Sequence, residues 1–314
     1  GAHMTKRAIL VTGAGGFVCS EFALALHRAD HDVLAVDRTF DAATTARLKG
    51  IRLIEGQLPQ VLAGLDHDGL EAVIHGAAIT ASPERLGVSR AAHIRRNMDL
   101  LTATLDFARG AGASKFLFIS SMGVFESNDA PSPNGRFTEA TKPKATCTYC
   151  AAKQAGELLT ASAAEPKFAT LSVRLGNIFG AFEAIRESRQ HLCLVSRMLA
   201  EARTGGVITV GTPEAEREWS WLPDLATAIA LLMQKFETSG APVIHAGTPP
   251  AITDLALARA IAARIHGAKI RLSPPPHNPI RPPMGSGVAS VFEAAQWTGM
   301  DDALNQMIQA EVTT

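Results

Sequence analysis

Two hydrophobic patterns alternate along the first half of the chain. Short, mostly apolar runs predict buried strands at 8–11, 32–37, 51–55, 72–75, 115–121 and 171–175. Longer stretches with apolar residues three or four positions apart predict helices at 20–28, 88–109 and 149–164. Strands separated by helices predict an α/β fold, a Rossmann-type doubly wound parallel sheet.

Beyond residue 180 the pattern loosens. Helices are expected at 192–202, 225–235 and 253–265, with a short strand at 207–210. The proline-rich stretch 273–283 is expected to be a surface loop, because proline lacks the backbone N–H that a helix or central strand needs. We therefore expect a smaller mixed lobe after the sheet domain.

A glycine-rich turn lies between the first expected strand and the first helix. Gly13 permits the tight turn and Gly16 lets the backbone approach a pyrophosphate. The N–H groups of Phe17 and Val18 would meet the phosphates at the helix N-terminus. The turn therefore predicts a dinucleotide site.

Asp37 closes the second expected strand and indicates which dinucleotide binds. A carboxylate there bonds the adenosine ribose hydroxyls and repels a 2′-phosphate, which predicts NAD. Arg38 could stack on adenine or attract that phosphate, so NADP stays open.

Tyr149, the only tyrosine in the chain, precedes Lys153 by four residues in an alanine-rich helical stretch. This spacing places both side chains on one helical face. An ammonium near the phenol favours the phenolate, so the pair can give or take a proton near neutral pH.

Composition narrows the class of protein. The formal net charge is zero, and no basic run suggests a nucleic-acid surface. No apolar run approaches the roughly 20 residues that span a bilayer. No signal peptide is visible, and residues 1–4 resemble the scar of a cleaved tag. A cytoplasmic enzyme is expected.

The four cysteines leave two interpretations. Cys147 and Cys150 form a C-x2-C pair that could join His191 and Cys193 at a metal. That pairing lacks standard zinc spacing and would occupy the segment presenting Tyr149. We therefore expect no metal and free thiols in a reducing compartment.

The motifs together resemble the extended short-chain dehydrogenase/reductases, the group of NAD-dependent epimerases and dehydratases. The resemblance covers nearly the whole chain after residue 4. The matching segments are Thr12–Cys19, His75–Ala78, Asn97, Ser120–Phe125, Glu139, Tyr149–Lys153, Arg174–Gly180, and Arg217 with Asp224.

The resemblance implies a role for each matching position. Tyr149 would be the general acid/base, Lys153 would favour its phenolate and hold the nicotinamide ribose, and Ser121 would bond the reacting substrate oxygen. Gln57, Leu58, Ala77 and Ala78 would lie along the cofactor. Residues 5–175 would form the NAD-binding Rossmann domain, and residues 176–314 mainly the substrate-binding lobe.

Two positions depart from the family pattern. Cys19 replaces the third fingerprint glycine, which implies a slight displacement of the helix or a pocket for the thiol. Gln57 replaces an aspartate near adenine, and its amide can still form hydrogen bonds.

The substrate side of the sequence is less specific. Asn177 and Arg217 match positions that face the substrate in nucleotide-sugar members of the family. Arg186 and Arg189 lie beside the expected cleft, and arginines bind carboxylate or phosphate bidentately. This expected arginine cluster can bind a compact anionic polyol such as a sugar acid. A UDP-sugar is negatively charged as well, and the absence of a recognisable uridine platform at 180–211 favours the sugar acid over it.

Three functions follow from these residues. An NAD-dependent dehydrogenase of a sugar or sugar acid is favoured over a nucleotide-sugar 4-epimerase. A non-catalytic NAD(P)-binding regulatory protein is the third, and the intact Ser121, Tyr149 and Lys153 argue against it. The resemblance also implies a homodimer formed by the helices at 88–109 and 149–164.

Overall fold

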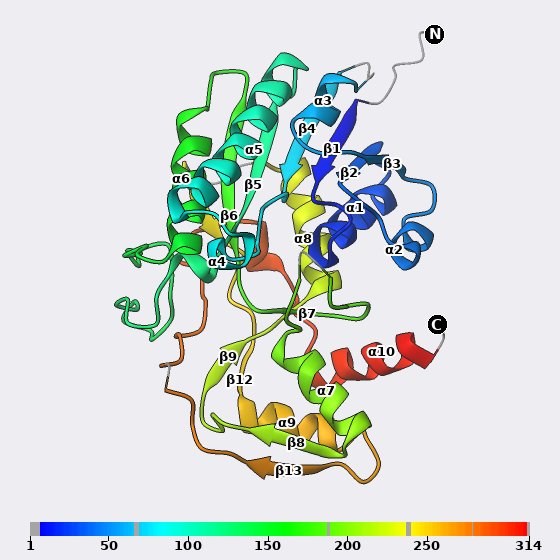
Figure 1. The fold of residues 1–314 in the computed structure, drawn as a ribbon, viewed down its shortest axis with the longest axis vertical. Coiled ribbons are helices and arrows are strands. Elements are labelled where there is room, and N and C mark those ends of the chain that lie inside the picture. The colour runs from blue at the N-terminus through cyan, green and yellow to red at the C-terminus, as the bar shows by residue number, and fades with distance from the viewer. Residues whose placement is uncertain (1–6, 66–68, 187–188, 237–239, 278, 313–314) are drawn as a thin grey trace.

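A parallel sheet of seven strands, in the order β11-β6-β5-β4-β1-β2-β3, forms the larger body of the computed structural model (Figure 1). The structure describes residues 7–65, 69–186, 189–236, 240–277 and 279–312, so the expected tag scar at 1–4 lies outside them. The six predicted strands are confirmed. They correspond to β1 (Ala8–Thr12), β2 (Val33–Asp37), β3 (Arg52–Glu55), β4 (Leu70–His75), β5 (Lys115–Ser121) and β6 (Ala169–Leu175). The seventh strand of the sheet is β11 (Val243–His245).

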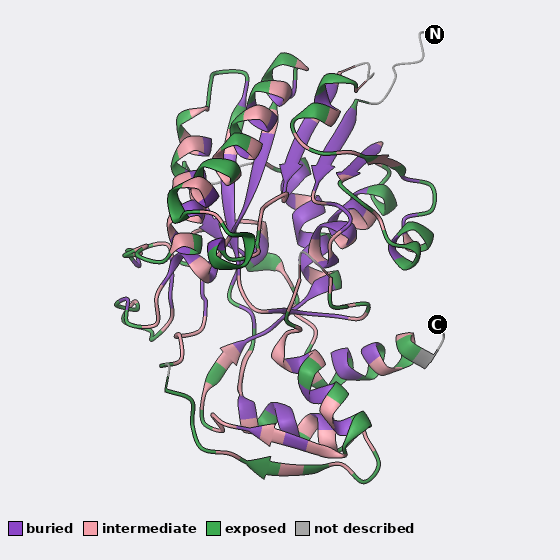
Figure 2. Ribbon diagram, viewed as in Figure 1, coloured by how far each residue is buried: buried purple, intermediate pink, exposed green. Residues whose placement is uncertain are grey.

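Helices cover both faces of this sheet, as a doubly wound fold requires. On one face lie α1 (Phe17–Arg28) and α8 (Leu222–Gln234), and on the other α5 (Arg90–Gly110) and α6 (Thr148–Ser162) (Figure 1). Short helices α2 (Ala42–Arg47), α3 (Gln60–Ala63) and α4 (Pro83–Leu86) lie in the connections. The central strands are buried, because both faces are covered (Figure 2).

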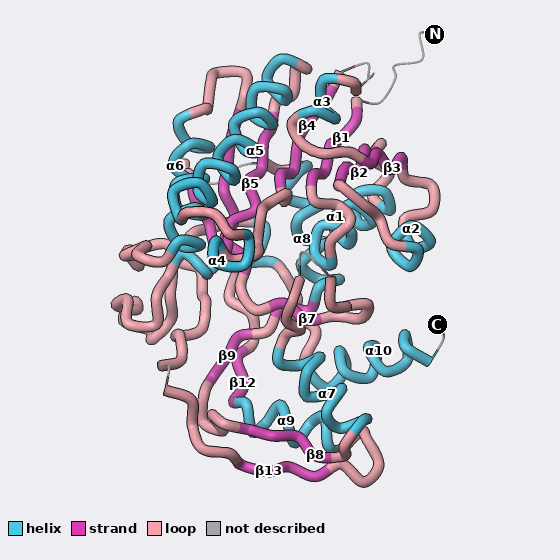
Figure 3. The backbone as a smooth tube through the Cα atoms, viewed as in Figure 1, coloured by secondary structure: helices cyan, strands magenta, loops and turns pink. Residues whose placement is uncertain are grey.

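The smaller lobe packs around its own apolar cluster, which includes Val195, Leu199, Leu257 and Leu304. Loops cross between this lobe and the carboxyl ends of the sheet strands (Figure 3). Its elements are α7 (Leu194–Thr204), β8 (Val207–Val210), β9 (Glu216–Glu218), β12 (Ala251–Thr253), α9 (Asp254–Ala262), β13 (Lys269–Leu272) and α10 (Met300–Val312). The two-residue strands β7 (Ile178–Phe179) and β10 (Ser220–Trp221) pair at its junction with the body.

The second half of the chain also contributes to the larger body. Strand β11 pairs with β6, and α8 packs with α1, although both follow residue 175. The sequence analysis expected α8 but did not identify β11, whose three residues are too few to show a period. The division at residue 175 stays a prediction.

A buried polar network joins α6 to the strands beside it. Arg174 donates two 2.7 Å hydrogen bonds to Glu157, and Ser120 donates another to the same carboxylate. The guanidinium of Arg174 also lies 3.3 Å from Nε2 of His245. The backbone N–H of His245 in turn donates to Glu139. These bonds satisfy groups whose burial would otherwise be costly.

Two buried histidines predict acid sensitivity. Burial lowers the pKa of His75 to about 3 and that of His245 to about 4, from 6.5. Unfolding exposes both to water, so the unfolded chain binds more protons below pH 6.5. The free energy of unfolding should therefore fall as the pH drops from 6.5 towards 4, by about 2 kcal/mol per histidine at pH 5.

Urea unfolding at pH 7 and pH 5 measures this loss. His245→Gln should reduce the difference between the two pH values, whereas the same change at the exposed His266 should not. Equal stability of the wild type at both pH values would contradict the prediction.

Candidate active site

A cavity of about 780 Å³ lies at the carboxyl ends of the central strands. It brings together the two groups that the sequence analysis proposed, the cofactor residues and the catalytic residues. Those lining it are Gly13, Gly16, Phe17, Val18, Asp37, Arg38, Gln57, Leu58, Ala77, Ala78, Ser121, Tyr149, Lys153 and Asn177. Arg186 and Arg217 are not among the residues that line it.

The glycine turn at one end of this cavity fits a dinucleotide phosphate. Gly13 has a φ of 72°, and a Cβ there would come within 2.8 Å of the Gly76 backbone. Gly16 is the N-cap of α1 and gives the helix no side-chain cap. The first N–H groups of the helix are therefore left for an anion.

Asp37 sits at the edge of this turn. Its carboxylate accepts hydrogen bonds from the N–H groups of Gly15, at 2.8 Å, and Arg38, at 2.7 Å. Burial raises the pKa of Asp37, and these two N–H groups oppose the rise. Each oxygen keeps a second acceptor position, so the carboxylate can also bond ribose hydroxyls.

Cys19 stands where the family has the third fingerprint glycine, and its side chain is accommodated because it packs against another glycine. A Cβ on Gly76, at the end of β4, would lie only 2.3 Å from the Cys19 Sγ. Gly76 therefore provides the space that the thiol occupies. The helix keeps its close approach to the sheet through this pairing of a larger residue with a smaller one.

Gly76→Ala is expected to weaken the fold and NAD binding together, because the new methyl group would collide with the Cys19 sulfur. Overpacking of this kind costs about 1–3 kcal/mol. Urea unfolding and calorimetric NAD titration measure the two effects. In the double variant Cys19→Gly/Gly76→Ala the collision is removed, so its losses should be smaller than those of Gly76→Ala alone. Purely additive losses would contradict the proposed packing.

Tyr149, Lys153 and Ser121 meet at the other end of the cavity. Tyr149 is 36% exposed, and the Lys153 Nζ lies 5.8 Å from the centre of its ring. Lys153 also donates to the Ile119 carbonyl at 3.2 Å, which holds the ammonium against β5. The Ser121 Oγ accepts the Gly123 N–H at 2.9 Å.

Gly123 also shapes the site around Tyr149, and the sequence analysis did not identify it. A Cβ at this position would come within 2.5 Å of the Tyr149 ring and 3.2 Å of the Ser121 Oγ. The missing side chain therefore lets the phenol ring pack beside Ser121. Its position, two residues after Ser121, was the signal available in the sequence.

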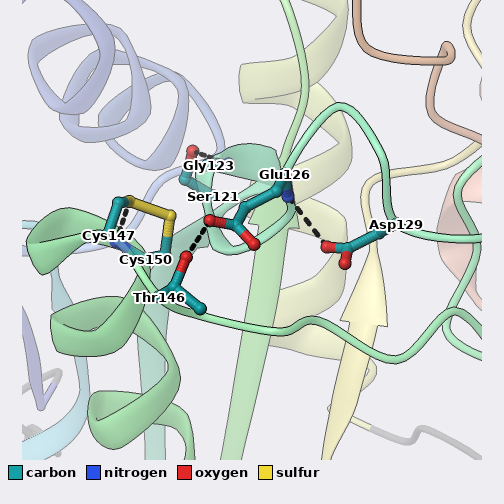
Figure 4. Close-up of a disulfide and its surroundings, with 7 residues drawn as sticks. All are labelled: Ser121, Gly123, Glu126, Asp129, Thr146, Cys147 and Cys150. Carbon is teal, nitrogen blue, oxygen red and sulfur yellow. Dashed lines mark hydrogen bonds between the residues drawn. A yellow bond between two sulfur atoms is a disulfide. The ribbon is translucent and has the colours of Figure 1, made fainter.

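The expectation of free thiols is wrong for two of the four cysteines. Cys147 and Cys150 form a disulfide with a Cα–Cα distance of 5.2 Å (Figure 4). Cys147 is the N-cap of α6 and Cys150 lies in its first turn, so the helix brings the two side chains together. Cys19 and Cys193 are free.

Comparison with known proteins agrees with this geometry. Residues 9–247 match the profile of the NAD dependent epimerase/dehydratase family. The chain belongs to this family. Within the residues described, no helix has both the length and the apolar character needed to cross a membrane.

The proteins similar to this chain are named for different reactions. The chain is 28% identical over 251 residues to a UDP-glucose 4-epimerase of Corynebacterium glutamicum, which covers 76% of this chain and 75% of that protein. It is 27% identical over 268 residues to a dTDP-glucose 4,6-dehydratase of Streptomyces niveus, covering 81% and 76%. The structure of Thermotoga maritima UDP-glucose 4-epimerase with UDP-glucose shares the fold, with a TM-score of 0.79, 20% identity, and coverage of 98% and 99%.

The expected cluster of Arg186, Arg189 and Arg217 does not form in this structure. The Arg186 guanidinium bonds Asp41 and Thr44 of the α2 N-terminus, on the side of Asp37. Arg189 pairs with Glu183 at 2.6 Å, and Arg217 pairs with Asp254 at 2.9 Å. Each guanidinium therefore already has a carboxylate partner.

Arg281 and Glu218 are polar residues near the catalytic end that the sequence analysis did not single out. Burial lowers the pKa of Arg281, and the charges of Glu218 and Tyr149 oppose this change. Glu218 is fully buried, and its carboxylate accepts the Asn177 side-chain N–H at 2.9 Å. Arg281 lies in the proline-rich loop, where no local pattern distinguishes it from a surface charge.

Proposed function

We propose that this protein converts a nucleotide-linked sugar by NAD-dependent oxidation of a ring hydroxyl and return of the hydride, as a 4-epimerase does. The observation that carries the proposal is the space beyond Tyr149. A second cavity of about 440 Å³ shares Thr80, Ala81 and Tyr149 with the first. Two adjoining cavities suit an elongated substrate better than one compact sugar acid.

The residues at the junction of the two cavities have defined tasks in this reaction. Tyr149 takes the proton of the reacting hydroxyl, and Ser121 bonds the same oxygen as it becomes a carbonyl. Lys153 keeps a positive charge beside the phenol. NAD, when bound, supplies the hydride acceptor.

Charge on the substrate side fits a diphosphate. Arg281 lies within electrostatic range of Tyr149, whereas Arg217 is already paired with Asp254. Arginine donors bind phosphate oxygens well. The prediction of a sugar acid rested in part on Arg186 and Arg189 joining Arg217, and their ion pairs with Asp41 and Glu183 remove that part of its support.

Incubation with NAD and UDP-glucose, UDP-galactose, dTDP-glucose or free sugar acids tests the proposal. We expect interconversion of an epimeric pair of nucleotide sugars, followed by chromatography, without net formation of NADH. Accumulation of NADH in proportion to product would favour a dehydrogenase instead. Tyr149→Phe is the control for contaminating activity.

We also propose a homodimer that pairs α5 and α6 with their copies. These two helices pack on each other, and Leu158 of α6 is 69% exposed. Light scattering should report a dimer, and Leu158→Asp should shift it towards the monomer. A monomeric wild type at micromolar concentration would contradict the pairing.

A further inference from the structure

The disulfide lies directly beside the tyrosine of the active site. Cys147, the N-cap of α6, and Cys150, in its first turn, flank Thr148 and Tyr149 in the sequence, and Figure 4 shows the bond between their sulfur atoms. We propose that this pair is a reversible thiol–disulfide site that reacts with dithiol reductants and controls proton transfer by Tyr149. The inference rests on the role proposed for Tyr149, but its test needs no substrate.

The two sulfur positions differ in access. Cys147 is exposed and lines the 440 Å³ cavity together with Tyr149. Cys150 is only 3% exposed. A reductant can therefore reach the sulfur of Cys147 while that of Cys150 is covered, the arrangement that thiol–disulfide exchange requires.

The exchange balances with a dithiol as the reductant. One thiolate of the dithiol attacks the Cys147 sulfur, the S–S bond breaks, and Cys150 leaves as a thiolate that takes up a proton. The second thiol of the reductant then attacks its own sulfur in the mixed disulfide and releases Cys147. Two electrons pass to the pair and the dithiol becomes a disulfide; one proton goes to Cys150, and the other is released to water when Cys147 stays a thiolate.

The released Cys147 sulfur is placed to carry negative charge. It is the N-cap of α6, and the backbone N–H of Cys150 lies 3.0 Å from it. A helix N-terminus stabilises a thiolate. A thiolate on the wall of the cavity that also contains Tyr149 opposes a second negative charge on the phenol.

Other charged groups near Tyr149 are the same in both redox states. They are Lys153 on α6, Glu84 on α4, Arg90, His93, Arg96 and Asp99 on α5, Glu126 after β5, and Arg281 after β13. The change between the two states therefore comes from the cysteine pair.

The two remaining cysteines are poor competitors for the reductant or an oxidant. Burial raises the pKa of the Cys19 and Cys193 thiols to about 12 in each case. Such thiols stay protonated near neutral pH and react slowly. A redox response of this chain is therefore assigned to Cys147 and Cys150.

Counting thiols in denatured protein is the first test. The chain has four cysteines, so the oxidised protein should show two reactive thiols and the protein treated with dithiothreitol should show four. Four thiols after preparation in air without reductant would overturn the proposal.

Ionisation of Tyr149 is the second test. It is the only tyrosine of the chain, so the ultraviolet absorbance of phenolate reports this residue alone. We expect the midpoint of its titration to lie about 0.5 pH units or more higher after reduction. Coincident curves for oxidised and reduced protein would overturn the proposal.

Variants separate the pair from the rest of the molecule. Cys147→Ser/Cys150→Ser should titrate identically with and without dithiothreitol, and Cys193→Ser should keep the wild-type difference. Cys150→Ala retains the Cys147 thiol and should match reduced wild type under both conditions. A response that survives in either cysteine-pair variant would assign the effect elsewhere and overturn the proposal.

Discussion

Tyr149→Phe should lower turnover by about 10²–10⁴-fold while leaving NAD affinity nearly unchanged. The substitution removes only the hydroxyl that exchanges the proton. The ring that packs on Gly123 stays. Turnover of the active nucleotide sugar and calorimetric NAD titration measure the two quantities.

Lys153 and Leu158 provide comparisons on the same helix. Lys153→Ala should reduce both turnover and NAD affinity, because its ammonium lines the cofactor cavity beside Tyr149. Leu158→Ala shortens a side chain of the proposed dimer contact, which does not line the cavity, and should leave both quantities close to wild type as long as the dimer persists. Substantial turnover in Tyr149→Phe would refute general acid–base catalysis by this phenol.

Glu157→Gln should destabilise the fold by about 3–5 kcal/mol, because it leaves the Arg174 guanidinium buried without its counter-charge. The Arg174 and Glu157 side chains are 7% and 4% exposed, and two hydrogen bonds of 2.7 Å join them. Urea unfolding measures the loss. Arg174→Met should cost a similar amount, since it leaves the buried Glu157 carboxylate without its counter-charge.

Two further variants show whether burial is the cause. The double variant Glu157→Gln/Arg174→Met removes both charges and should recover much of the loss. Glu165→Gln breaks the exposed pair with Arg109 and should change stability little, because water screens that pair. Equal losses from the buried and exposed pairs would contradict the explanation.

The sequence predicted those parts of the site that depend on neighbours along the chain. Gly13 and Gly16 lie at fixed offsets after an apolar strand, and Asp37 ends the next strand. The four-residue spacing of Tyr149 and Lys153 needs only a helix. These features come from backbone geometry and periodicity, so they can be identified without knowledge of distant contacts.

The partners of the charged residues needed the structure. Arg186 bonds Asp41 across 145 positions, and Arg217 bonds Asp254 across 37. From the sequence we predicted that both arginines bind the substrate. No local signal in the sequence shows that each guanidinium forms an ion pair with a carboxylate of another element. Glu218 could not be identified from the sequence for the same reason. It is buried against Asn177 because β9 lies close to the end of β6.

By itself, the sequence determined an α/β sheet, a glycine turn after the first strand, and a helix with Tyr149 and Lys153 on one face, since each follows from local periodicity. Only the tertiary structure decided that Gly76 makes room for Cys19, that β11 completes the sheet, and that Arg281 reaches the catalytic end. The Cys147–Cys150 disulfide lies between these cases. Its spacing is local, but a C-x2-C pair can also stay reduced or bind a metal. The start of α6 at Thr148 places the two sulfur atoms on one turn and decides among these possibilities.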